Sequence, residues 1–304
     1  MNYIEKINKD LISNIKNLKN LTLFGQNIDS GSFLSGLTKN INNLKNAKII
    51  NSTNCENTLV GFGFGLALKN QNAIYVCKQQ DFLLLTMDQI VNTYNSLRII
   101  GFKGSFSIIT IIVDSGYEGP QSRLNNLSEF SSLANLDIWN ISTNFESMLV
   151  NKMISKPGFR LICVSQKNFR IEIPNIKGQI TNFSNKKVIQ YLNGSQIAII
   201  CFNFSIISLI KDINHLDKRK VALYNVINHK CDFEILAKRL VNFKKILILD
   251  DSRSEVSNSI LLSDLIKKFN NLVNIKILKK RDSLSNLFPN KDNYDINIIS
   301  EIRD

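Results

Sequence analysis

The residues best suited to chemistry lie in one stretch of the chain, from 51 to 98. Near its start, Glu56 follows the turn-forming run NSTN at 51–54 and opens an apolar helical pattern that continues to about Lys69. A carboxylate in the first turn of a helix balances the helix macrodipole, and a carboxylate in a sheltered site can also move a proton. The sequence leaves both roles open for Glu56.

Three glycines interrupt this helical pattern at every second position, namely Gly61, Gly63 and Gly65. Each costs about 1 kcal/mol relative to alanine inside a helix, so we expect another backbone or a ligand to approach the helix closely. The G-x-G-x-G spelling is not a dinucleotide fingerprint, because the glycines fall inside the helix rather than in a turn before it. A phosphate-binding loop is therefore excluded for this stretch.

Other candidate nucleophiles and metal ligands are sparse. The five cysteines show no C-x-x-C spacing, and Cys77, Cys163 and Cys201 lie in apolar, strand-like runs. This pattern predicts reduced, buried thiols, with neither a zinc site nor a disulfide framework. Cys55 stands beside Glu56, but its sequence neighbours include no histidine or cation that would activate it as a nucleophile.

The composition of the 304-residue chain, with 44% apolar and 21% charged residues, is that of a globular protein large enough for two domains. The formal net charge is +13; residues 1–150 hold 12 basic against 11 acidic residues, and residues 151–304 hold 26 against 14. The basic residues form short pairs without interleaved aromatic residues or a nucleic-acid motif. We therefore expect a solvated basic surface, or one that meets an acidic partner subunit, and no nucleic-acid partner.

The hydropathy pattern contains no run of about eighteen uninterrupted apolar residues, which a membrane-spanning helix would need. The N-terminal residues 1–11 mix charges into helical spacing and do not resemble a signal peptide. The sequence therefore predicts a cytoplasmic protein with no membrane partner.

The elements that must position Glu56 alternate between helices and strands. The pattern predicts helices over 4–18, near 31–44, over 56–69 and over 82–99, and strands over 21–24, 73–77 and 106–113. Alternation without hairpin turns is typical of a parallel, doubly wound sheet. Residues 166–195 are linker-like in composition, and strands over 197–202, 221–226 and 246–249 follow them. The predicted fold class is α/β, with two doubly wound domains, the larger over 1–180 and the smaller over 195–304.

Several motifs resemble one enzyme family. The order of a turn, an acid, a glycine-rich apolar helix, a short strand and DFLLLTMDQIVN at 81–92 resembles the beta subunit of the thiamine-diphosphate-dependent decarboxylase component of 2-oxoacid dehydrogenases, which is also the pyrimidine-binding half of transketolases. The upstream run 23–41 resembles the family's opening strand, with Gln26 and Asn27 where the family usually has acids. KILILDD at 245–251 is similar to the family's C-terminal domain, although His229 and Lys230 stand where Arg-Pro is usual.

The resemblance covers nearly the whole chain and implies a pyrimidine-binding domain followed by a C-terminal domain that mainly holds subunits together. Glu56 matches the glutamate that hydrogen-bonds the far ring nitrogen of the cofactor's aminopyrimidine. Phe82 matches the aromatic residue that packs on this ring, and an ordinary core phenylalanine at a helix start is the alternative. No chemistry is implied for Asp250, Asp251 or His229.

Two absences qualify the resemblance. The chain contains no Gly-Asp-Gly, the run that holds magnesium and the diphosphate in this family. The resemblance therefore implies that a separate alpha-type subunit holds the metal and the diphosphate, in an α2β2 tetramer. Where the family commonly has Gln-His-Ser in a substrate-side loop, this chain has Gln121, Ser122 and Arg123. Either the reaction needs no histidine there, or Arg123 or the partner supplies a group for an anionic substrate, or the loop is divergent surface.

Three functions remain open. The first is a beta-type subunit that forms the carbanion of thiamine diphosphate and acts on a 2-oxo acid, with acyl or aldehyde transfer after decarboxylation. The second is a split transketolase or a carboligase in specialised sugar metabolism. The third is a non-catalytic partner subunit that retains the fold. The sequence does not name the acceptor, whether a lipoyl group, an aldehyde or a proton.

Overall fold

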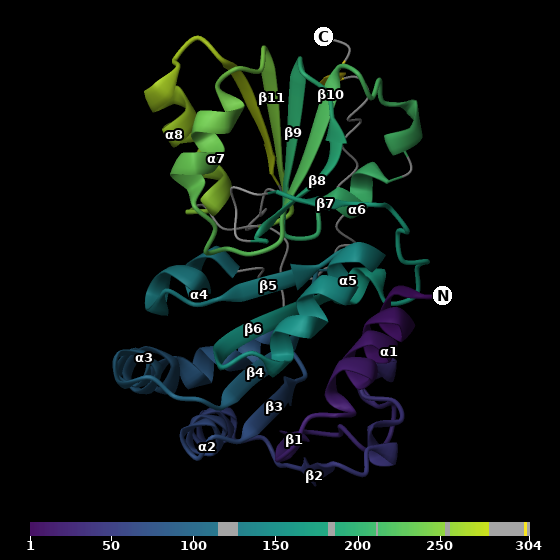
Figure 1. Cartoon of the computed structure of the whole chain (residues 1–304), viewed down its shortest axis with the longest axis vertical. Helices are drawn as coiled ribbons and strands as arrows, with labels where there is room; N and C mark the ends of the chain where they lie inside the picture. The colour runs from purple at the N-terminus through teal and green to yellow at the C-terminus, as the bar shows by residue number, and fades with distance from the viewer. Residues whose placement is uncertain (115–126, 182–185, 211, 253–255, 280–300, 303–304) are drawn as a thin grey trace, which may run out of the picture.

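The computed structural model describes residues 1–114, 127–181, 186–210, 212–252, 256–279 and 301–302. Gln121, Ser122 and Arg123, the expected substrate-side loop, lie outside the described residues. The described chain forms two six-stranded sheets with helices packed on their faces (Figure 1). The expected α/β class with two doubly wound units is therefore confirmed.

The first sheet is entirely parallel, in the order β2-β1-β3-β4-β6-β5. Its strands are β1 (Leu21–Gly25), β2 (Ala47–Asn51), β3 (Asn72–Cys77), β4 (Ser105–Ile112), β5 (Ile138–Ile141) and β6 (Gly158–Ser165). The chain passes from β1 to β2 on one side and from β3 to β4 on the other, so the topology switches direction between β1 and β3. In open α/β sheets, ligands bind at the carboxyl ends of the strands at such a point.

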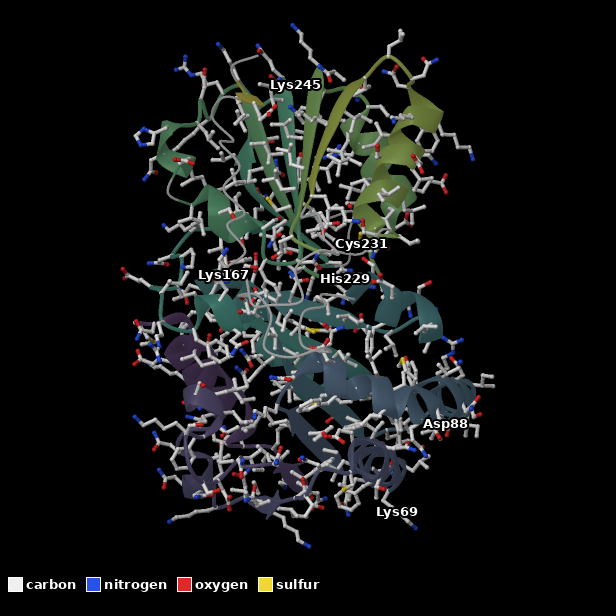
Figure 2. All side chains as sticks on the ribbon, turned by 180° about the vertical axis from the view of Figure 1, so that it is seen from behind. Lys69, Asp88, Lys167, His229, Cys231 and Lys245 are labelled. Carbon is white, nitrogen blue, oxygen red and sulfur yellow. The ribbon has the colours of Figure 1, made fainter. Side chains whose placement is uncertain are left out.

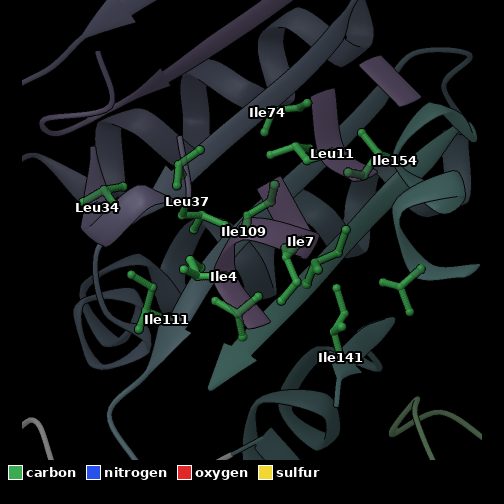
Figure 3. Packing of buried hydrophobic residues seen from close by; sticks show 14 of the residues in the cluster. Ile4, Ile7, Leu11, Leu34, Leu37, Ile74, Ile109, Ile111, Ile141 and Ile154 are labelled. Atoms are coloured by element: carbon green, nitrogen blue, oxygen red, sulfur yellow. The ribbon is translucent and has the colours of Figure 1, made fainter. Parts of the chain in front are cut away.

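Helices cover both faces of this sheet (Figure 1). One face carries α1 (Tyr3–Ile15), α5 (Asn144–Asn151) and the short turns η5 (Lys152–Ser155) and η6 (Gln166–Asn168); the other carries α2 (Glu56–Leu68), α3 (Tyr94–Ile100) and α4 (Leu127–Ala134). Strand residues alternate between the faces, so Ile74 packs in the core on the α1 side whereas Tyr75 packs in the core on the α2 side. Figure 3 shows Ile7 and Leu11 of α1 packed among the strand residues of this core.

The helix predicted near 31–44 is wrong. The segment contains two single 3₁₀ turns, η1 (Leu34–Gly36) and η2 (Ile41–Asn43). Phe33, Ser35 and Asn40 adopt left-handed backbone conformations there, which interrupt a right-handed helix. The asparagine-, serine- and glycine-rich composition favours such local turns over a continuous helix.

The single long helix predicted over 82–99 is also wrong. The chain instead forms a 3₁₀ helix η3 (Gln80–Thr86), a π-helical turn η4 (Gln89–Thr93) and then α3. The Thr86 hydroxyl donates to the carbonyl oxygen of Leu83 at 2.6 Å, a local bond that closes the last turn of η3. These changes in helical pitch place Gln80, Asp81 and Leu83 inside the protein.

The second sheet has the order β12-β11-β9-β10-β8-β7, in which β9 to β12 are parallel and β7 and β8 pair antiparallel. Its strands are β7 (Gln179–Ile180), β8 (Val188–Asn193), β9 (Ile197–Phe202), β10 (Val221–Val226), β11 (Lys245–Asp250) and β12 (Asn274–Lys279). The helices beside it are α6 (Ile206–Leu209), η7 (Ile213–His215), α7 (Phe233–Leu240) and α8 (Asn258–Phe269). The segment expected to be a linker thus supplies β7 and β8 to this sheet.

The two sheets meet through a polar seam. The backbone N–H of Asn140 donates to the carbonyl oxygen of Ile227 at 2.9 Å, and that of His229 donates to Ile138 at 3.1 Å. Figure 2 shows His229 between the two halves of the molecule and Lys245, the first residue of β11, at the far end. The carboxyl ends of the second sheet therefore face the first sheet.

Candidate functional site

The switch point between β1 and β3 brings three loops together. Gly25 ends β1 and pairs in register with Asn51 of β2 and Val76 of β3. A Cβ atom on Gly25 would lie 2.3 Å from the carbonyl oxygen of Val76, and the residue has φ +151°. Only glycine fits there. The Ser52 N–H then donates to the Gly25 carbonyl oxygen at 3.0 Å, which fixes the path of the chain into α2.

Glu56 is the first residue of α2 and lies half-buried. Burial raises the pKa of the Cys77 thiol to about 12, and the nearby Glu56 charge contributes to the rise. Glu56 therefore lies near the carboxyl end of β3. Its carboxylate accepts no hydrogen bond from the residues that the structure describes, so both of its oxygens are available to a ligand.

Three side-chain oxygen atoms in the segments that follow β2 and β3 are buried and lack a hydrogen-bond partner: Ser52 Oγ, Gln80 Oε1 and Asp81 Oδ2. Ser52 directly follows β2, and Gln80 and Asp81 open η3 directly after β3. An unpaired buried polar group costs about 1–3 kcal/mol, and native proteins retain few of them. The cluster therefore has the properties of a site that a ligand or bound water completes.

Asp81 is the residue of this site that the sequence reasoning missed. Its side chain is only 5% exposed. Burial raises its pKa to about 6, and a hydrogen bond from its own backbone offsets part of the rise. The available signal was a run of polar residues, Lys78 to Asp81, between a strand and the apolar segment that begins at Phe82.

Phe82 follows Asp81 in η3 and is partly buried against the core that η3 and α2 share. Glu56 and Phe82, predicted from the resemblance, therefore lie on two elements that both begin at the carboxyl edge of the first sheet. Their roles toward a cofactor stay predictions.

The three glycines of α2 have different surroundings. A Cβ atom on Gly63 would lie 2.2 Å from Cζ of Phe106, a ring in the protein's own core. At Gly61 the nearest atom would be 3.5 Å away, on the flexible side chain of Gln89, and at Gly65 nothing lies within 4 Å. The expectation that a backbone or ligand approaches all three is wrong within this chain, and only Gly63 is required by packing.

All five cysteines are free thiols, and Cys55 alone among them is not buried. No group of three His, Cys, Asp or Glu side chains in the described ranges could hold a metal ion, and no helix in those ranges is long and apolar enough to span a membrane. Asp250, the last residue of β11, accepts hydrogen bonds from Asn203 and Ser259, which is a structural arrangement.

Comparisons with known proteins identify the fold. The sequence matches no protein-family model and no curated protein. Among solved structures, the chain is similar to one described as a split-gene transketolase, an inactive beta4 tetramer, with a TM-score of 0.70 and 11% identity over 92% of this chain and 88% of that chain. At this identity the match shows the fold alone. The chain therefore has a transketolase-like fold over nearly its whole length, as the resemblance implies.

Proposed function

We propose that this chain is the beta-type, pyrimidine-binding subunit of a two-subunit thiamine-diphosphate-dependent enzyme that acts on a 2-oxo acid. The observation that carries the proposal is the carboxyl edge of the first sheet beside the β1/β3 switch point, where α2 begins with the unbonded carboxylate of Glu56 and η3 begins with the unpartnered buried oxygens of Gln80 and Asp81. The transketolase-like fold supports it. In this proposal the pyrimidine-binding domain extends over 1–180 and the C-terminal-type domain over 195–304, with β8 in the segment between them.

Glu56 and Phe82 have the chemistry that binding of an aminopyrimidine ring requires. Glu56 would hold a proton at the far ring nitrogen, and Phe82 would pack on the face of the ring. When bound, the cofactor would supply a nucleophilic thiazolium carbon, provided that the far ring nitrogen is protonated or hydrogen-bonded. The task of this chain is therefore to keep a proton at one ring atom and to orient the ring.

The cofactor's diphosphate and its magnesium ion require a second chain, because this sequence contains no Gly-Asp-Gly run. We propose an alpha-type subunit that supplies them, in a cytoplasmic α2β2 tetramer. The similar solved structure is described as an inactive beta4 tetramer. By analogy, we expect this chain to assemble with itself when alone, to bind thiamine diphosphate weakly and to show no turnover.

A second candidate, a split transketolase or carboligase that transfers a two-carbon ketol unit, is favoured by the description of that similar structure. In both candidates Arg123 is proposed to pair with an anionic substrate, beside Gln121 and Ser122. A reconstituted enzyme that turns over 2-oxo acids but not ketose phosphates supports the first candidate, and the reverse supports the second.

The decisive experiment compares wild type with Glu56→Gln after co-expression with the alpha-type subunit of the same organism. Hydrogen–deuterium exchange at the thiazolium carbon should fall about a hundred- to ten-thousandfold in the variant, because an amide cannot share a proton with the ring nitrogen. The exposed Glu172→Gln is the matched control and should leave exchange unchanged. An equal exchange rate in Glu56→Gln removes this residue from the mechanism and favours a non-catalytic partner subunit.

A further inference from the structure

Asp81 differs from the other buried charges of the described chain. Glu146 is fully buried, but its oxygens accept hydrogen bonds from Tyr191 at 2.6 Å, from Asn225 at 2.7 Å and from the Ser142 N–H at 2.7 Å. Each of these bonds holds a structural charge in place. Oδ2 of Asp81 has no such partner, although it is just as inaccessible to bulk water.

The buried, positively charged guanidinium of Arg160 also has hydrogen-bond partners, unlike Oδ2 of Asp81. It donates to the carbonyl oxygens of Ile154 at 3.2 Å, Lys156 at 2.5 Å and Pro157 at 2.9 Å, and to the hydroxyl of Ser107 at 3.0 Å. The chain therefore satisfies the buried charges that have a structural role. Asp81, by contrast, lacks a hydrogen-bond partner for Oδ2. It lies directly before Phe82, at the edge of the sheet where ligands bind in such folds.

The chemistry of the unpartnered atoms after β2 and β3 indicates what would complete them. All three are oxygens, and two of them, Oε1 of Gln80 and Oδ2 of an ionised Asp81, can only accept hydrogen bonds. The hydroxyl of Ser52 can accept as well. A ligand that fits this set presents N–H donors, as an amino-substituted heterocycle does.

We propose that Asp81 recognises the exocyclic amino group of the cofactor's pyrimidine and makes the site prefer an aminopyrimidine over its oxo analogue. The inference rests on the proposed function, because Glu56 and Phe82 are what would place the ring. The amino group lies across the ring from the nitrogen that Glu56 engages, so the two acids act on opposite ends of one ligand. An oxo group in the same place would face a carboxylate without a hydrogen to donate.

The test uses the isolated chain and two probes that lack a diphosphate: thiamine and its 4-oxo analogue, titrated by ligand-observed NMR. Wild type should bind thiamine at least about tenfold more tightly than the oxo analogue. Asp81→Asn should bring the ratio near one, because a carboxamide turns either its N–H or its carbonyl oxygen toward the ligand. Asp88→Asn, an exposed aspartate seven residues along the chain, should retain the wild-type ratio (Figure 2).

Glu56→Gln separates this inference from the proposed function, because it should weaken both probes and leave their ratio unchanged. A wild-type ratio that persists in Asp81→Asn overturns the role of Asp81 while leaving the proposed function intact. Wild type that binds both probes equally overturns it as well. Binding of neither probe, alone or with the alpha-type subunit, overturns both proposals. A thermal unfolding curve for each variant establishes that it is folded.

Discussion

Glu56 and Asp81 are two carboxylates that open neighbouring elements at the carboxyl edge of the first sheet, and their environments differ. Glu56 is half-buried at the start of α2, whereas Asp81 is buried at the start of η3. Burial without a cationic partner disfavours the charged form of an acid, and this is why the pKa of Asp81 rises to about 6.

At the residue scale, Asp81→Asn should make the folded chain more stable at neutral pH. The pKa of Asp81 is raised from 3.8 to about 6 in the folded state, so the folded state binds the proton more tightly than the unfolded state. The free energy of unfolding of wild type therefore rises as the pH falls from 6 to 4, and above pH 6 the ionised carboxylate is a penalty. Removing it should add about 1–3 kcal/mol at pH 7.5.

Urea unfolding between pH 4.5 and 8 measures this effect, with Asp88→Asn as a control that should stay within about 0.5 kcal/mol of wild type. Between pH 8 and pH 4.5, the free energy of unfolding should rise less in Asp81→Asn than in wild type, because the variant lacks the carboxylate that takes up a proton. A variant less stable than wild type at pH 7.5 would mean that the Asp81 carboxylate has a stabilising partner.

At the scale of elements, the packing of α2 determines where Glu56 lies. It carries Glu56 at its first turn and packs Gly63 directly against Phe106 of β4. Phe106 is itself fully buried and packs against the rings of Phe64 and Phe159, each with ring centroids 5.1 Å away. The helix therefore cannot move away from the sheet without disturbing this aromatic core, and the position of Glu56 depends on it.

This contact predicts opposite effects for two neighbouring substitutions. Gly63→Ala should lower the free energy of unfolding by about 1–3 kcal/mol, because the added methyl group overlaps a ring that cannot move. Gly61→Ala should be neutral or stabilising by up to about 1 kcal/mol, because its Cβ meets only ordinary contacts and alanine favours the helix. Thermal or urea unfolding of both variants checks the pair. Equal effects would show that α2 tolerates displacement.

At the scale of the whole molecule, the helices on the α2 side of the first sheet leave large apolar side chains in contact with solvent. These residues are Phe62 and Leu68 of α2, Leu84 and Leu85 of η3, and Ile99 and Ile100 of α3. Leu85 is 68% exposed and Ile99 is 84% exposed. Large exposed apolar side chains gathered on one side of a sheet favour an interaction site in a globular protein, as expected for a subunit that assembles with further chains.

Leu85→Glu should therefore reduce the size of the assembly that the purified chain forms at micromolar concentration, since it places a charge in the interface we propose. Light scattering measures the effect. Leu272→Glu, at an 89% exposed position in the second domain, is the control and should leave the mass unchanged. Wild type that remains a monomer with and without the alpha-type subunit would contradict the proposed tetramer.

The sequence by itself determined the features that depend on local spacing. The alternating apolar pattern predicted two doubly wound units, and the turn before Glu56 predicted where α2 begins, because periodicity and helix-start signals lie within a few neighbouring residues. The predicted helix start at Phe82 lies two residues from the observed start of η3 at Gln80, although the segment forms a 3₁₀ helix rather than an α-helix. The positions of Glu56 and Phe82 in the chain therefore followed from the sequence, while their roles remain predictions.

Only the tertiary structure decided the features that depend on distant contacts. The burial of Asp81 results from packing η3 against α2 and the sheet, and nothing in the residues beside Asp81 specifies that neighbour. Gly63 is required because Phe106, 43 positions later in the chain, occupies the space of its missing side chain. The membership of β8 in the second sheet depends on its antiparallel pairing with β10, since pairing energy comes from a partner strand that is remote in sequence.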